Sequence, residues 1–114
     1  HAEMMRVDPN LIERYLLEMG KIGAHSETGV WRTLYSPEWT QANALFSRWS
    51  EDAGLAVSTD AVGNVWAKAV GTDGGPSIVS GSHIDTQCPG GRYDGTLGIL
   101  SALVAVRTLQ ELYG

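Results

Sequence analysis

Apolar residues at helical spacing predict two amphipathic helices in the first half of the chain. Asp8-Pro9 is typical of a helix N-cap followed by proline in the first turn, and the apolar pattern behind it continues to about 20–23. Ser36-Pro37 repeats this start signal, and a second apolar stripe runs from there to Gly54. Between the two helices, the mixed polarity of residues 24–35 predicts a loop.

The second half of the chain predicts strands and a third helix. Residues 55–59 and 64–70 alternate between apolar and polar positions on either side of a turn, which predicts a hairpin. Residues 77–82, centred on Ile78-Val79, contain no charged side chain and predict a strand covered on both faces. Residues 97–112 are apolar almost all round, so we expect a deeply buried helix.

The order of these elements predicts an α/β fold. Two helices, three strands and a helix suit the beginning of a three-layer domain. A buried helix that follows a buried strand normally leads into another parallel strand, and the chain reaches Gly114 where that strand would start. We therefore expect an architecture that is cut short.

Composition restricts the class of protein. The 114 residues are enough for one domain, and 43% hydrophobic with 18% charged residues is typical of a folded chain. A net charge of −5 with eight scattered basic residues argues against a nucleic-acid partner. The sequence has no apolar run near the roughly 20 residues that span a bilayer, so we expect no membrane partner.

The start of the chain and its cysteine content bear on domain bounds and compartment. His1 in place of an initiator Met indicates that residues 1–8 are a tag remnant or flexible N-terminus, which leaves 9–114 as the folded part. Cys88 is the single cysteine and cannot form an internal disulfide. Together with the absence of a signal-peptide pattern, this favours a cytoplasmic location.

Candidate chemistry is concentrated in one glycine-rich segment, residues 81–98. Alternate residues of a strand face the same side, so His83 and Asp85 can face one site. A metal-binding histidine usually donates its other ring N–H to a carboxylate, and Asp85 can supply it. Asp94 follows the flexible Gly90-Gly91 and can return to the same point, where its two oxygens can bridge two metal ions. The alternative is a turn with a capping Asp and a surface His, but the length of the ordered motif favours a metal site.

The motif resembles that of a known family. Gly-Ser-His-Ile-Asp-Thr at 81–86 with Gly-Gly-Arg-Tyr-Asp-Gly-Thr-Leu-Gly at 90–98 resembles the metal-binding signature of the M20 metallopeptidase clan. More narrowly, it resembles the hydantoinase/carbamoylase amidases: N-carbamoyl-L-amino acid hydrolases, β-ureidopropionases and allantoate amidohydrolases. Residues 29–32, 35–38 and 60–65 match the same family. The short interval between the two aspartates favours the amidases over the peptidase branch.

This resemblance implies a fold and a set of site residues. Residues 9–114 would be the N-terminal part of a three-layer α/β/α, dinuclear zinc-peptidase-like catalytic domain, truncated before the remaining strands and the dimerisation domain. His83 would bind one of two divalent ions (zinc, manganese, cobalt or nickel), and Asp94 would bridge both. Asp85 would act in catalysis by orienting His83. The catalytic Glu, the other metal ligands and a substrate-binding Arg would lie beyond Gly114.

The implied activity is cleavage of the C–N bond of a small N-carbamoyl or ureido substrate by a homodimeric parent enzyme. Two ions need roughly six protein ligands, and this chain supplies two, so we expect the 114 residues alone to be inactive. Two alternatives stay open. The parent can be a peptidase or deacylase of the same clan, or the chain can be a non-catalytic assembly module whose unpaired sheet edge binds another chain.

Overall fold

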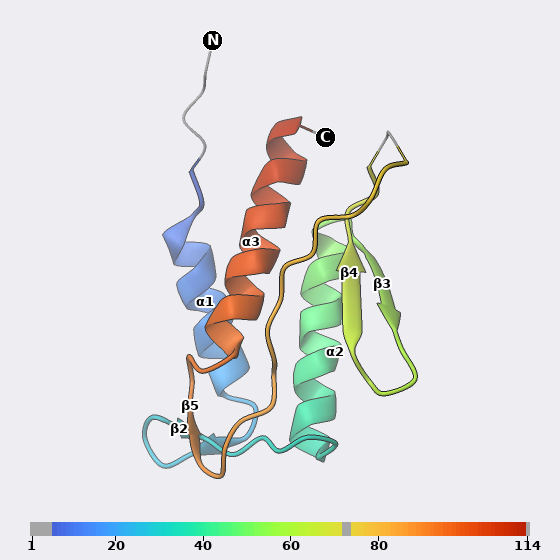
Figure 1. Cartoon of the computed structure of the whole chain (residues 1–114). Coiled ribbons are helices and arrows are strands. Elements are labelled where there is room, and N and C mark those ends of the chain that lie inside the picture. Colours follow the sequence, from blue (N-terminus) through green and yellow to red (C-terminus); the bar gives the residue numbers. More distant parts are fainter. Residues whose placement is uncertain (1–5, 72–73, 114) are drawn as a thin grey trace.

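The computed structural model describes residues 6–71 and 74–113 (Figure 1). Its elements in chain order are α1 (Pro9–Gly20), β1 (Ala24–His25), β2 (Gly29–Val30), α2 (Pro37–Asp52), β3 (Ala56–Thr59), β4 (Val65–Lys68), β5 (Gly90–Gly91) and α3 (Thr96–Tyr113). Helix α1 packs against α3, and the β3–β4 hairpin packs against α2. The helices therefore form the centre of the molecule, and the strands lie at its edges.

Both predicted helix starts are confirmed. The side chain of Asp8 accepts a hydrogen bond from the backbone N–H of Asn10, and Ser36 Oγ accepts one from Trp39. In each helix a proline occupies the first turn, where its missing N–H costs no hydrogen bond. Residues 1–5 of the predicted N-terminal tag lie outside the described residues.

The predicted β3–β4 hairpin is also confirmed, with antiparallel pairing from Ala56↔Lys68 to Thr59↔Val65. Its turn is organised by Asp60, whose carboxylate accepts hydrogen bonds from the side chain and backbone of Asn64, from Trp66 Nε1 and from the Val62 N–H. These bonds, above all the one from the Asn64 side chain, lower the pKa of Asp60 to about 2. The hairpin is thus encoded within a few neighbouring residues.

The prediction that residues 24–35 form only a loop is wrong. This segment contributes β1 and β2 to a three-stranded antiparallel sheet in the order β1-β2-β5. Strand β2 pairs with β5 through Gly29↔Gly91 and Val30↔Gly90. Because the partner lies far along the chain, a local hydrophobic pattern could not reveal this pairing.

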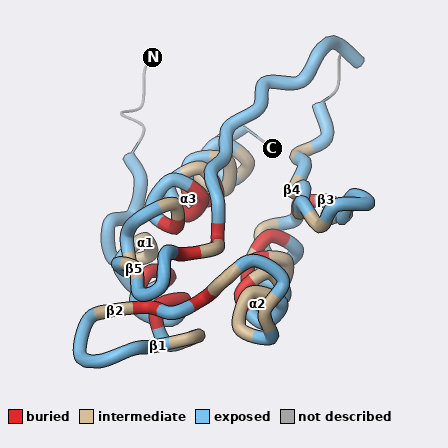
Figure 2. The backbone as a smooth tube through the Cα atoms, turned by 60° about the horizontal axis from the view of Figure 1, so that its bottom comes forward, coloured by how far each residue is buried: buried red, intermediate tan, exposed pale blue. Residues whose placement is uncertain are grey.

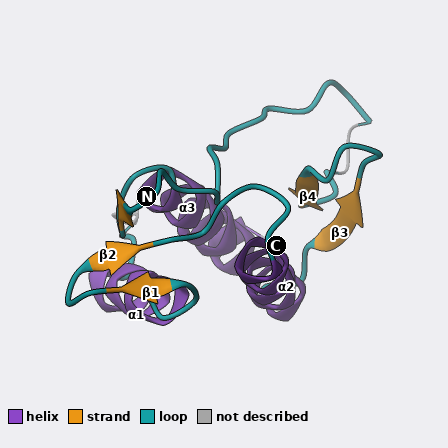
Figure 3. Cartoon of the chain, turned by 90° about the horizontal axis from the view of Figure 1, so that it is seen from below, coloured by secondary structure: helices purple, strands orange, loops and turns teal. Residues whose placement is uncertain are grey.

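The predicted strand at 77–82 is also wrong for this chain. Residues 74–82 are extended, but no strand within the described ranges pairs with them, and Figure 3 draws them as loop. Ile78 is 101% exposed, and the whole segment 74–82 is exposed in Figure 2. A strand buried on both faces needs strands beside it and layers above and below it, and the described part of the chain provides none of these.

Helix α3 is buried on one side instead of all round. Its buried residues join a core with α1, α2 and the site segment: Tyr15, Leu16, Met19, Ala42, Phe46, Leu55, Ile84, Ile99, Leu100, Leu103 and Val104. Leu97, Leu109 and Leu112 of the same helix are exposed, so the expectation of complete burial is wrong for its outer face. None of the helices in the described ranges combines the length and apolar character needed to cross a membrane.

Candidate metal centre

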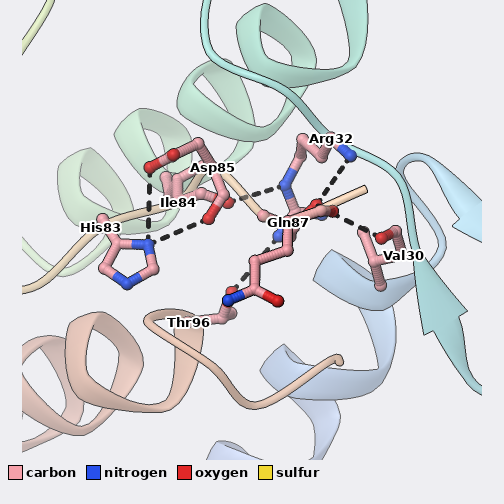
Figure 4. A network of polar contacts seen from close by, with 8 residues as sticks. Val30, Arg32, His83, Ile84, Asp85, Gln87 and Thr96 are labelled. Carbon is pink, nitrogen blue, oxygen red and sulfur yellow. Dashed lines mark hydrogen bonds and ion pairs between the residues drawn. The ribbon is translucent and has the colours of Figure 1, made fainter. Parts of the chain in front are cut away.

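His83 contacts Asp85, but its shorter contact is with the backbone carbonyl and not with the carboxylate that the sequence predicts as its partner. The Nδ1 atom of His83 lies 2.9 Å from the Asp85 carbonyl oxygen and 3.4 Å from its Oδ1 (Figure 4). Across residues 6–71 and 74–113, no side chain or backbone group hydrogen-bonds to Nε2 of His83. An imidazole whose Nδ1–H is donated to an oxygen presents a neutral Nε2, which is the form that binds a metal ion.

Asp94 is brought near His83 by the next residue, Gly95. A Cβ atom on Gly95 would lie 2.5 Å from both Nδ1 and the carbonyl oxygen of His83, and Gly95 has a φ of +72°. Both the space and the backbone conformation therefore require glycine here. The backbone at Gly95 passes directly against His83, and Asp94, the residue before it, is exposed. That the two side chains bind one ion stays a prediction.

The donor chemistry fits part of a divalent-metal site. An imidazole nitrogen and a carboxylate oxygen are ligands suited to zinc, manganese, cobalt and nickel. Within the described ranges, however, no three or more His, Cys, Asp or Glu side chains are grouped so that they could hold an ion. His83 and Asp94 therefore fit a partial ligand set, which needs donors from elsewhere.

Arg32 is the residue of this region that the sequence analysis missed. It is 1% exposed, and its guanidinium donates four hydrogen bonds, of which Figure 4 shows those to Ile84 and Thr96. Nε donates to the Ile84 carbonyl at 3.0 Å, and Nη2 donates to Thr96 Oγ1 at 3.2 Å. Nη1 donates to the carbonyls of Met19 and Ile22 at 3.0 and 2.8 Å. One buried side chain thus joins the end of α1, the site segment and the start of α3.

The environment of Arg32 is unusual for a cation. Burial lowers the pKa of Arg32, and the negative charge of Asp85 opposes that shift. Arginine nevertheless keeps its charge in proteins, and here neutral oxygens accept hydrogen bonds from four of its five N–H donors. Arginine is rarely fully buried, so the mixed polarity of residues 24–35 did not indicate its burial, and the family match at residues 29–32 gave it no role.

The backbone of Arg32 holds the same segment through Thr86. The Thr86 N–H donates to the Arg32 carbonyl at 2.7 Å, and the Arg32 N–H donates to Thr86 Oγ1 at 2.9 Å. Thr86 Oγ1 is also 3.2 Å from the Val30 carbonyl. Since β5 pairs with β2 just beyond, the loop between Thr86 and Gly90 is fastened at both ends to residues 29–32.

Comparison with known proteins gives a consistent family. No family model matches the chain. It is 41% identical over 106 residues to an allantoate amidohydrolase of Bacillus subtilis (strain 168), which covers 92% of this chain and 26% of the relative. It is 40% identical over 112 residues to an N-carbamoyl-L-amino-acid amidohydrolase of Rhizobium meliloti. This match covers 97% of this chain and 27% of the relative.

Comparison with solved structures gives the same result as comparison with known sequences. A hydantoinase/carbamoylase family amidase from Burkholderia ambifaria superimposes with a TM-score of 0.91 at 38% identity, covering 98% of this chain and 29% of that one. AtUAH in complex with glyoxylate gives a TM-score of 0.89 at 31% identity. This match covers 94% of this chain and 26% of that one. The chain spans about a quarter of the length of these relatives, which confirms the prediction of a partial α/β domain. In sequence and fold, the chain is therefore homologous to hydantoinase/carbamoylase family amidases over about a quarter of their length.

Proposed function

We propose that this chain supplies part of the dinuclear metal site of a full-length amidohydrolase that cleaves the C–N bond of N-carbamoyl amino acids or allantoate. The observation that carries the proposal is the pairing of His83 Nδ1 with Asp85, which leaves Nε2 for a metal ion beside the Asp94-Gly95 backbone. The substrate class rests on the similar proteins, which are named allantoate amidohydrolase and N-carbamoyl-L-amino-acid amidohydrolase.

Each of the three residues has a separate role in this proposal. His83 would bind one ion through Nε2, and Asp94 would bridge two ions of zinc, manganese, cobalt or nickel. Asp85 holds the imidazole in the tautomer and orientation that binding requires. When bound, the ions supply Lewis acidity at the scissile carbonyl and lower the pKa of a water molecule.

The whole protein would act on a small ureido substrate as a cytoplasmic homodimer. A peptidase or deacylase of the same clan is the second candidate, but the similar proteins named above are amidohydrolases, which favours the first. Assaying a dipeptide, an N-carbamoyl amino acid and allantoate with the full-length protein separates these two. Size measurement by light scattering tests the homodimer.

The decisive experiment measures ammonia release by the full-length protein, first stripped of metal and then supplied with each ion in turn. His83→Ala and Asp94→Asn should each lower the rate by about 100-fold or more, because the first removes a direct ligand and the second removes the negative charge and the second oxygen that bridging requires. His25→Ala is the matched control, since His25 lies exposed in β1. Undiminished turnover in His83→Ala would rule out the proposed site.

The 114-residue chain alone should show no turnover and only weak metal binding. Its two direct ligands fall short of the roughly six that two ions need. Titration calorimetry and the ammonia assay on the purified chain test this. Hydrolysis of an N-carbamoyl amino acid by this chain would contradict the proposal that the site is shared with other residues.

A further inference from the structure

We infer that Arg32 is a positioning residue that sets the spacing between the two metal-binding segments, 83–85 and 94–96, from inside the core. The inference rests on the proposed function, because it assumes that these segments bind metal. Arg32 makes no hydrogen bond to the side chain of either proposed metal ligand. It would instead hold the two segments that carry these ligands at a fixed separation.

One planar group reaches both segments. Nε of Arg32 donates to the carbonyl of Ile84, the residue between His83 and Asp85. Nη2 donates to Oγ1 of Thr96, which begins α3 two positions after Asp94. A single guanidinium therefore spans the distance between the two segments (Figure 4).

This guanidinium bridge is itself anchored to α1. Nη1 donates to the carbonyls of Met19 and Ile22, in and just after the last turn of α1. Met19 is fully buried, so this end of α1 belongs to the core. A guanidinium held from three directions cannot shift toward one segment without losing a hydrogen bond to another.

Position 32 requires arginine. The guanidinium is a rigid fork with five N–H donors, whereas lysine has one ammonium group on a flexible stem. Lysine at this position would keep the charge but could not bond Ile84, Thr96 and the α1 carbonyls together. Because Arg32 is buried, water cannot easily replace the missing contacts.

A purely structural role for Arg32 would be visible as a loss of stability alone. A positioning role predicts in addition that folded molecules bind metal less well. Outer-shell substitutions typically weaken metal binding by about 10–100-fold, and we expect a change in that range for Arg32→Lys. The catalytic rate kcat should fall more than KM changes, because substrate contacts are not altered directly.

The experiment uses the metal-free full-length protein and Co²⁺ as the probe. Co²⁺ affinity is measured by competition with a chromophoric chelator, and the coordination geometry is followed by the visible absorption of bound Co²⁺. The variants are Arg32→Lys and the milder Thr96→Val, which removes only the bond to Nη2. Leu103→Ala is the control, because it destabilises the core at a buried residue that is not a hydrogen-bond partner of the Arg32 guanidinium.

The expected result is weaker Co²⁺ binding and an altered absorption band in both Arg32→Lys and Thr96→Val, with neither change in Leu103→Ala. Wild-type affinity and an unchanged band in folded Arg32→Lys would overturn the inference. If Arg32→Lys does not fold, Thr96→Val decides the question by the same two readouts. Failure of the unsubstituted protein to bind Co²⁺ or hydrolyse any ureido substrate would instead refute the proposed function itself.

Discussion

The site segment 83–96 and the segment 74–82 that precedes it differ sharply, although both are largely irregular. Ile84 and Thr86 are buried, and four hydrogen bonds join residues 84–96 to Arg32. In contrast, Ile78 is fully exposed, and Figure 2 shows its whole segment on the surface. The more apolar of the two segments is thus the less buried one.

This difference shows which contacts hold the candidate metal site in position. The position of His83 does not come from a strand, because residues 81–87 have no strand pairing in the described structure. It comes from the long-range polar contacts of Arg32 and from the close approach of Gly95. An exposed apolar stretch cannot hold itself in place, whereas a few buried hydrogen bonds can.

The largest expected effect is that of Arg32→Met on the free energy of unfolding of the 114-residue chain. The substitution leaves buried carbonyls without a donor, and at about 1–3 kcal/mol per group we expect a loss of about 4 kcal/mol. The control is Arg107→Met, because Arg107 donates to Tyr15 and Glu111 nearer the surface and should cost under about 1 kcal/mol. Urea unfolding measures the loss of stability in both variants. Equal losses would show that the buried hydrogen bonds of Arg32 stabilise the chain no more than those of Arg107 nearer the surface.

Gly95→Ala should have the next largest effect. The added Cβ meets the ring and the carbonyl of His83, and the positive φ strains any other residue, so we expect a loss of about 1–3 kcal/mol. A shift of the His83 imidazole signals in NMR spectra should accompany the lower unfolding temperature. Gly91→Ala is the control, since a Cβ there meets no atom within 4 Å. If the two variants behave alike, Gly95 does not hold His83.

A smaller effect is expected at the β3–β4 turn, where the structure is local. The pKa of Asp60 is lowered to about 2 from 3.8, so its ionised form stabilises the hairpin above about pH 4, and this contribution is lost as the pH falls toward 2. Trp66 fluorescence should follow this loss, because its Nε1 donates to Asp60. Asp60→Asn should flatten the acid response without changing the NMR signals of His83. A coupled change at His83 would show that the two regions are not independent.

Ile78→Ser should have the smallest effect. Its side chain is fully exposed, so we expect a change within about 0.5 kcal/mol in the unfolding of the 114-residue chain. Ile84→Ala provides the contrast, since Ile84 is buried in the core and should cost about 2–5 kcal/mol. A loss above about 1 kcal/mol for Ile78→Ser would indicate that the segment is covered in solution.

The sequence by itself determined the features that depend on neighbouring residues. The helix caps Asp8 and Ser36 and the hairpin turn at Asp60 are visible in it because each acts within a few positions. The 3.4 Å approach of the Asp85 carboxylate to His83 is local for the same reason, since one residue separates the two. The family motif was likewise readable, since it is a local string of residues.

Only the tertiary structure decided what depends on distant parts of the chain. The burial of Arg32, the pairing of β2 with β5 and the contact of Gly95 with His83 each join residues far apart in sequence. The same holds for the exposure of Ile78 and of the outer face of α3. Burial depends on what covers a residue, and hydrophobic pattern alone reports which side chains favour burial but not what lies against them.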